Sequence, residues 1–208
     1  DANEYYGQLA LLYQLSEKLS VGPGYRFGSS DVENGEDQTF DRWLLRGDYE
    51  LTGKTTVSGS IGVEIRDFEG AGAIDEREAL VYNFGLDYRL METVNLLCEV
   101  YRRDVSSSLR SNNNFITTGV QATLQVTLLQ SLVASLQGLF ENADYYNTLV
   151  AATADRDDDY FSLKLALDYT SPQDLLGSVF YRFRTNDSTS DAIDFDNNQF
   201  GVQLGKEF

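Results

Sequence analysis

Histidine is absent from this chain of 208 residues, and cysteine occurs once. The lack of histidine excludes Ser-His dyads and triads, imidazole metal sites and histidine-dependent protease sites. The single Cys98 excludes an internal disulfide, and it lies between Leu96 and Val100, where a thiol behaves as a small apolar side chain. Carboxylates are plentiful, but no pair stands out from the general excess of acid. We therefore expect no enzymatic activity, no catalytic residue and no cofactor.

Long hydrophobic runs are also lacking. No segment approaches the roughly 18 consecutive apolar residues of a transmembrane helix. The lack of such runs does not exclude a transmembrane β-barrel, because only alternate residues of its strands face lipid. Proline is scarce, with only Pro23 and Pro172, as a complete hydrogen-bonded ladder requires. Thirteen tyrosines and twelve phenylalanines supply the side chains that form aromatic girdles at membrane interfaces.

Short polar turns recur along the chain between segments in which apolar and polar residues alternate. Their centres lie near Glu17, Gly53, Glu92, Ser131 and Pro172, at intervals of 36, 39, 39 and 41 residues. Longer loops rich in acid follow every second segment. The pattern predicts repeated β-hairpins, with tight turns at one end and long loops at the other.

The alternation predicts eleven strands near 4–15, 19–29, 39–51, 55–68, 78–90, 94–104, 114–129, 132–146, 159–170, 175–186 and 197–208. A closed bacterial barrel has an even number of strands, with both termini on the periplasmic side. The simplest reading is a twelfth strand before Asp1, so that residues 1–208 form a single barrel domain lacking one N-terminal strand. A barrel of ten strands, with one segment misassigned, is the second choice.

One face of each predicted strand is apolar and is expected to face hydrocarbon. Examples are the rows Leu80, Tyr82, Phe84, Leu86 and Tyr88; Ile116, Val120, Ala122, Leu124, Val126 and Leu128; and Phe161, Leu163, Leu165, Leu167 and Tyr169. Aromatic residues lie mostly toward the ends of these rows, where the membrane interface is expected.

The opposite face carries the ions and is expected to line the lumen. Its members are Arg26, Arg42, Arg46, Asp48, Glu50, Glu64, Arg66, Asp87, Arg89, Glu99, Arg103, Gln121, Gln125, Glu141, Lys164, Asp168, Arg182, Arg184 and Glu207. A soluble sandwich buries one face in an apolar core, so this face argues against that class. Two interpretations remain open: basic tracks for acidic solutes, or ion pairs between neighbouring strands that fill the lumen.

The net charge of −17 belongs to the loops and rims. The predicted lining holds nine of the 16 cations and eight of the 33 anions, so the remainder holds seven cations and twenty-five anions. This excess disfavours nucleic acid as a partner. The acidic loops could concentrate cations or bridge divalent ions to lipopolysaccharide, or they could be a plain solvated surface. The run Asp155, Asp157, Asp158 and Asp159 is a weak metal candidate, because it lacks the glycine and terminal glutamate of an EF-hand loop.

The closing segment, Tyr181–Ser188 followed by Asp194–Phe208, resembles the final hairpin of the outer-membrane β-barrel porins. Related Tyr-Arg segments occur at Gly24–Phe27, Asp87–Arg89 and Val100–Arg103. The resemblance implies insertion into the outer membrane by the barrel-assembly machinery, which recognises a last strand ending in an aromatic residue. A weaker similarity is to the small monomeric porins for acidic oligosaccharides, which are twelve-stranded and lined by arginine.

Together these observations predict an all-β, antiparallel, up-and-down transmembrane β-barrel in the outer membrane of a Gram-negative cell. The long acidic loops are expected outside the cell, the short turns in the periplasm, and outer-membrane lipid and lipopolysaccharide around the wall. The expected function is a porin-like channel for passive or weakly selective diffusion through a charged lumen. The alternative is a non-conducting structural or adhesive barrel whose lumen is plugged by ion pairs.

Overall fold

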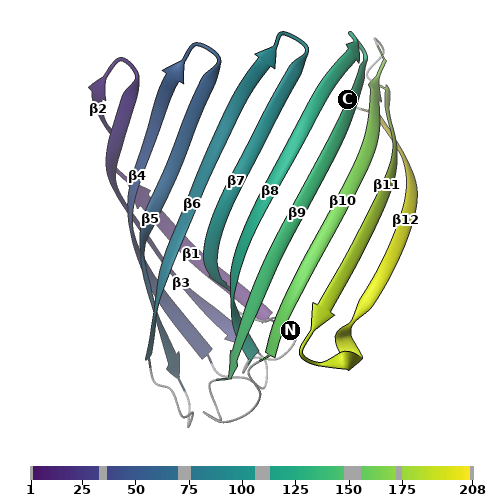
Figure 1. Ribbon diagram of the computed structural model, residues 1–208. Coiled ribbons are helices and arrows are strands. Elements are labelled where there is room, and N and C mark those ends of the chain that lie inside the picture. Colours follow the sequence, from purple (N-terminus) through teal and green to yellow (C-terminus); the bar gives the residue numbers. More distant parts are fainter. Residues whose placement is uncertain are drawn as a thin grey trace.

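The computed structural model describes residues 2–32, 37–69, 76–105, 113–147, 156–171 and 175–206, which form one curled antiparallel sheet (Figure 1). Its strands are β1 (Ala2–Ala10), β2 (Tyr13–Ser16), β3 (Leu19–Val32), β4 (Asp37–Thr52), β5 (Thr55–Glu69), β6 (Glu76–Met91), β7 (Val94–Val105), β8 (Asn113–Leu129), β9 (Leu132–Asn147), β10 (Arg156–Thr170), β11 (Leu175–Ser188) and β12 (Phe195–Lys206). From β3 onward each strand pairs with the next one in the sequence, so the predicted up-and-down fold is confirmed.

The eleven predicted strands are present, because β1 and β2 are two pieces of the first one. Both pair with β3, and the interruption falls opposite Pro23, which has no amide hydrogen for the ladder. There the Leu11 amide donates to the Pro23 carbonyl at 3.0 Å. Gly22 permits this close approach, since a Cβ atom on it would lie 1.7 Å from the Leu11 carbonyl oxygen.

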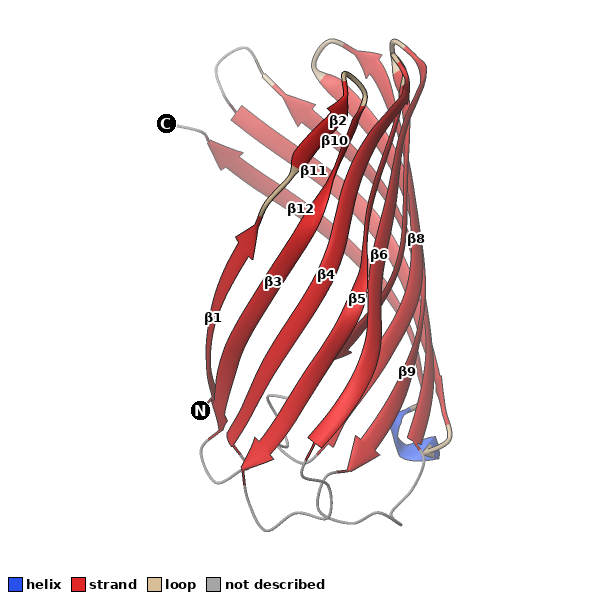
Figure 2. Cartoon of the chain, turned by 90° about the vertical axis from the view of Figure 1, so that its left-hand side faces the viewer, coloured by secondary structure: helices blue, strands red, loops and turns tan. Residues whose placement is uncertain are grey.

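Short and long connections separate to the two ends of the sheet, as the turn spacing predicts. Two residues connect the strands at the predicted turns near Glu17, Gly53, Glu92 and Ser131, whereas the turn at Pro172 lies outside the described residues. The N-terminus lies at the long-loop end and the C-terminus at the short-turn end (Figure 2). β1 and β12, the first and last strands of the pairing order, therefore run parallel to each other. We call the two ends the loop side and the turn side.

The outer face of the sheet carries large apolar side chains that remain exposed. Trp43 is 59% exposed and Leu165 49%, and on the last strand Leu204 reaches 84%. A soluble protein rarely leaves so continuous an apolar surface uncovered, so this face suits a hydrocarbon environment. The only helix among the described residues is the 3-10 turn η1 (Asp191–Ile193), and none of the described helices is long and apolar enough to cross a membrane.

Buried apolar side chains are few, and they gather on the loop side of the sheet. They are Phe40, Phe68, Ala79, Val81, Tyr101 and Ile116. Val81, on β6, is only 2% exposed. A single curled sheet cannot bury side chains so completely by itself, so a second layer must cover them.

Candidate functional site

The strand register places the predicted lining residues on the same face of the sheet. Arg26 lies opposite Arg42, which in turn lies opposite Glu64. Lys164 lies opposite Arg182, and each of the members below lies opposite a small, polar or charged residue on at least one neighbouring strand. These pairs are Arg46 with Ser60, Asp48 with Ser58, Glu50 with Thr56, Asp87 with Thr56, Arg89 with Asn95, Glu99 with Gln121, Gln125 with Ser135, Arg103 with Thr117, Glu141 with Tyr160, Asp168 with Ser178, Arg66 with Arg77 and Arg184 with Ser162. The two faces of the sheet thus differ in polarity along its whole width.

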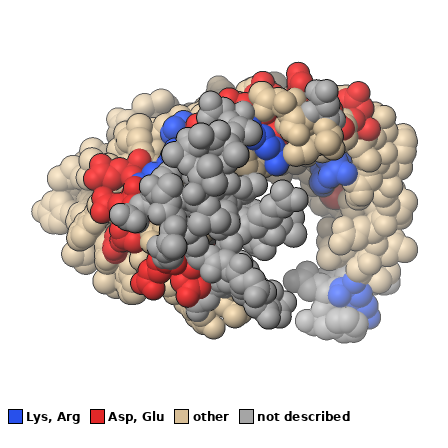
Figure 3. All heavy atoms as spheres, turned by 90° about the horizontal axis from the view of Figure 1, so that it is seen from below, with Lys and Arg blue, Asp and Glu red and all other residues tan. Residues whose placement is uncertain are grey.

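A cavity of about 620 Å³ lies at the loop side of this polar face. It is lined by Glu4, Arg26, Phe40, Arg42, Arg66, Arg103, Asp104, Val105, Phe115, Thr117, Glu141, Ala143, Tyr145, Asp158, Tyr160 and Asn186. Seen from the loop side, acidic side chains lie mainly around the outer rim, and several of the basic side chains lie further in (Figure 3). The cavity therefore combines both charge signs with aromatic rings.

The sheet divides at the loop side between β6 and β7. Their pairing ends where Tyr82 meets Arg102, although β6 continues to Glu76 and β7 to Val105. Beyond this point β7 pairs only with β8, as far as Val105 with Phe115. Figure 1 shows the two strands diverging toward their lower ends. The loop-side ends of β7, β8 and β9 therefore leave the line of the wall.

These three strand ends lie inside the wall formed by β4, β5 and β6. Asp104 shares its row with the outward-facing Val100, yet its carboxylate lies 3.7 Å from the Arg66 guanidinium on the inward row of β5. Tyr146 shares a row with the outward-facing Phe140, yet Arg77 stacks over its ring at 3.7 Å. Contact between the outward row of β7–β9 and the inward row of β5–β6 requires one layer to pass inside the other. This layer covers Val81 and its buried neighbours.

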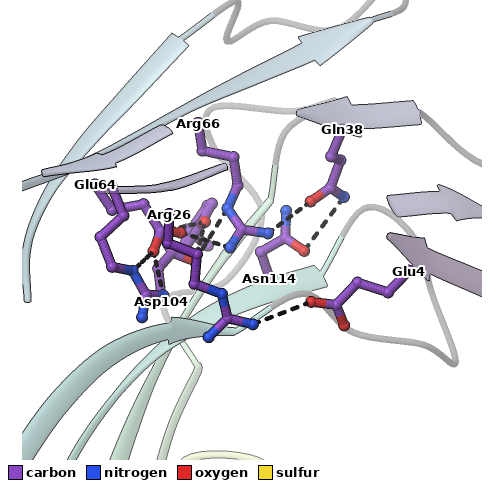
Figure 4. A network of polar contacts seen from close by, with 9 residues as sticks. Glu4, Arg26, Gln38, Glu64, Arg66, Asp104 and Asn114 are labelled. Carbon is purple, nitrogen blue, oxygen red and sulfur yellow. Dashed lines mark hydrogen bonds and ion pairs between the residues drawn. The ribbon is translucent and has the colours of Figure 1, made fainter. Parts of the chain in front are cut away.

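A polar network joins the two layers (Figure 4). Glu64 is fully buried and bonds to both Arg42 and Arg66, the latter at 2.6 Å. Arg66 also donates to Gln38 at 3.1 Å, and Gln38 donates to Asn114 on β8 at 3.4 Å. Because every ion here faces a partner of opposite charge, burial is possible without leaving a bare charge in a dry site.

Tyr146 completes the network from β9. Its hydroxyl donates to the two carboxylate oxygens of Asp104 at 2.7 and 2.9 Å, and its ring meets Phe68 edge-on. The side chain of Asp104 is only 1% exposed, so it depends on Arg66 and Tyr146 for the interactions that water would otherwise provide. Asp104 therefore links all three of β5, β7 and β9.

The outward assignment of Ile116 is wrong. Ile116 shares the parity of Val120, but it is 4% exposed and belongs to the second layer, whereas Val120 is 46% exposed. Alternation assigns faces correctly only while a strand stays in the wall. The sequence did not identify Asp104, Asn114 and Tyr146 as site residues for the same reason. The one sign of their role was that they are polar residues at the loop-side ends of apolar rows.

The turn side of the polar face is different. Nine charged side chains here form no ion pair with another described residue. They are Arg46, Asp48, Glu50, Asp87, Arg89, Glu99, Lys164, Asp168 and Arg182. Glu99 accepts from the Asn83 amide at 2.6 Å, and with Asp87 it lines a second cavity of about 330 Å³. Lys164 lies 5.1 Å from the Phe180 ring. These charged side chains lie on a part of the polar face that the second layer does not cover.

The aspartates of β10 do not gather at one point. Asp158 faces inward and pairs with Arg156 and the Ser188 hydroxyl, whereas Asp157 and Asp159 both accept from the Asn142 amide on the opposite face. Asp155 lies outside the described residues. Within the part of the chain that the structure describes, no group of three acidic or cysteine side chains could hold a metal ion.

Comparison with known proteins gives one named likeness. No protein family model and no curated protein matches this sequence. Thirteen chains of solved structures match, among them one described as the NanC porin in a rhombohedral crystal form. That match covers 99% of this chain and 99% of the other, with 10% identity and a TM-score of 0.47. A porin is thus among the structures that this chain resembles, but at this similarity the assignment of fold depends on the strand pairing itself.

Proposed function

We propose that this chain forms a pore of the bacterial outer membrane, through which small solutes or ions diffuse passively along a charged, water-filled interior. The observation that carries the proposal is the difference between the two faces of the curled sheet. Large apolar side chains remain exposed on one face from β1 to β12, and ionised side chains occupy the other. Lipid can accommodate the first face and water the second.

The turn-side charges support an open interior. Side chains such as Asp87, Arg89 and Lys164 have no ionic partner among the described residues, so their solvation must come from water. With eleven strands in the wall, the lumen is wider than a side-chain-filled barrel of eight and narrower than an open porin of sixteen. A small conductance follows.

The loop-side network favours a second candidate, a structural or adhesive barrel that does not conduct. Buried ion pairs such as Arg66 with Glu64, together with the layer of β7–β9, occupy part of the mouth. In this case the acidic loops, rather than the lumen, carry the function. They would bind divalent cations or lipopolysaccharide, although many of their residues, Glu33, Glu36 and Asp75 among them, lie outside the described part of the chain.

The proposal includes the expected surroundings of the protein. The barrel-assembly machinery inserts it, lipid and lipopolysaccharide surround its apolar face, the loops face outward and the turns face the periplasm. Neither catalysis nor nucleic-acid binding belongs to the proposal. The C-terminal Phe208, which the assembly signal requires, lies outside the described residues.

Single-channel conductance in a planar bilayer tests the pore directly. The refolded protein is inserted, insertion is verified by protease protection, and the reversal potential is measured under a salt gradient. A steady small conductance with measurable ion selectivity supports the pore. Absence of conductance from inserted protein contradicts it and favours the plugged barrel.

A further inference from the structure

We infer that the loop-side ends of β7, β8 and β9 form a hinged flap that moves between the inner position described above and a position in the wall, and so controls the width of the mouth. The inner flap comprises residues 103–105, 113–117 and 143–147. The inference rests on the proposed pore, because it assigns that pore a gate. The hinge is the point where the β6–β7 ladder ends, at Tyr82 and Arg102.

Toward β5 and β6 the inner flap is held by side chains, whereas β9 keeps its backbone ladder with β10 as far as Tyr145 opposite Arg156. Its edge strand β7 forms no ladder with β6 beyond Arg102, and the contacts on this side include Asp104 with Arg66, Asn114 with Gln38, and the Tyr146 ring with Arg77 and Phe68. Side-chain contacts of this kind can exchange without unfolding of the β7–β9 ladders. A unit that is rigid within itself and weakly attached along one edge is the usual construction of a hinged element.

An alternative position exists in the wall itself. Extending the β6–β7 register beyond Tyr82 with Arg102 would place Leu80 opposite Asp104 and Ala79 opposite Val105. Those β6 residues already have strand conformation, and they have no partner strand on the β7 side. In that position the flap would regain ladder hydrogen bonds, while the contacts with Arg66, Gln38 and Phe68 and the cover over Val81 would be lost. Two packings with compensating gains and losses are what a two-state element needs.

Movement of the inner flap would change the pathway because its inner surface lines the loop-side cavity. Arg103, Phe115 and Tyr145 all contribute to that lining, with the last two rings 4.9 Å apart. Return of the flap to the wall would carry these side chains outward and would expose Glu64 and Arg66 to the lumen. The mouth would widen, and its charge would change at the same time.

The first test releases the flap. Asp104→Asn together with Tyr146→Phe removes the ionic contact and the hydroxyl while nearly preserving volume. A hydrogen bond to a charged group is large enough to change a two-state ratio roughly tenfold or more, so we expect the ratio of open to closed dwell times to rise by that factor. The matched control is Asp87→Asn, which neutralises a turn-side carboxylate without an ionic partner. Unchanged dwell times in the double variant, or an equal change in the control, would overturn the gate.

The second test captures the open position and does not depend on conduction. In a Cys98→Ser background, Leu80→Cys and Asp104→Cys place two thiols directly opposite each other only if the flap pairs with β6, which suits disulfide geometry. We expect a disulfide after mild oxidation, detected by mass spectrometry, and a conductance that falls when it is reduced. The control Leu80→Cys with Val120→Cys lacks this proximity and should not cross-link.

The outcomes separate the gate from the pore. Efficient cross-linking without conductance in any variant would leave the flap intact as a mobile element and would reject the pore. Conductance that occurs in the native protein, together with no cross-link between positions 80 and 104, would keep the pore and reject the flap.

Discussion

The two halves of the interior are built from the same alternation but have opposite character. On the loop side, Glu64 and Asp104 are buried and paired with arginine. On the turn side, Asp87 and Lys164 lie on the same face of the sheet without an ionic partner among the described residues. The difference comes from the inner flap, which adds a second layer at one end only. The burial of these charged side chains therefore depends on the second layer and not on the alternation of residues along each strand.

The largest expected effect comes from Glu64→Ala. It leaves Arg42 and Arg66 without their buried carboxylate, and breaking a buried ion pair in this way costs about 3–5 kcal/mol. We expect that loss in the free energy of unfolding, measured by urea denaturation in lipid vesicles. The turn-side control Asp87→Ala should change it by less than about 0.5 kcal/mol, as for an exposed site. Equal losses at the two sites would remove the distinction between the halves.

Leu165→Arg tests the outer face. An arginine at mid-membrane depth on the lipid face costs roughly 2–4 kcal/mol, so insertion should be impaired. Gln125→Arg places the same side chain on the polar face and should be tolerated. The measurement is the fraction of protein that becomes protease-resistant on refolding into vesicles. Similar tolerance at both positions would contradict the register.

Tyr146→Phe sharpens the description of the buried network. The variant keeps the ring contact with Phe68 but removes the hydroxyl that serves Asp104. A lost hydrogen bond to a charged group corresponds to about 1.5–3 kcal/mol of unfolding free energy. Urea denaturation measures it, and the exposed Tyr169→Phe is the control. A loss in Tyr146→Phe no larger than that in the control would show that Asp104 does not depend on this bond.

The smallest effect on stability, with a clear effect on function, is expected from Lys164→Gln with Arg182→Gln. These cations lie opposite each other on the turn side, and their removal should change stability by less than about 0.5 kcal/mol per site. The lumen becomes more acidic, so the reversal potential should shift toward cation selectivity. No shift would mean that ions do not pass this part of the interior.

The sequence predicted the strands, the four turns that the structure describes and the alternation of polar and apolar faces, because these depend on local patterns. Period-two alternation locates each strand, and the two-residue turns fix its register. It could not predict the inner flap, since Asp104, Ile116 and Tyr146 have the parity of lipid-facing residues. The contact of Asp104 with Arg66, the contact of Tyr146 with Phe68 and the burial of Ile116 depend on where the β6–β7 ladder stops, and no local pattern records that point. The pairing of Arg66 with Glu64 within one strand was likewise not anticipated.

The labelling rate of single cysteines tests the difference between the two halves of the interior directly. The turn-side interior should be wet, the layered loop side should be dry, and the apolar outer face should be closed to water. Asp87→Cys, Ile116→Cys and Leu165→Cys, each with Cys98→Ser, are refolded into vesicles with a charged, membrane-impermeant maleimide on both sides. We expect rapid labelling at position 87, slow labelling at position 116 and none at position 165. Equal rates at positions 87 and 116, or rapid labelling at position 165, would contradict this expectation.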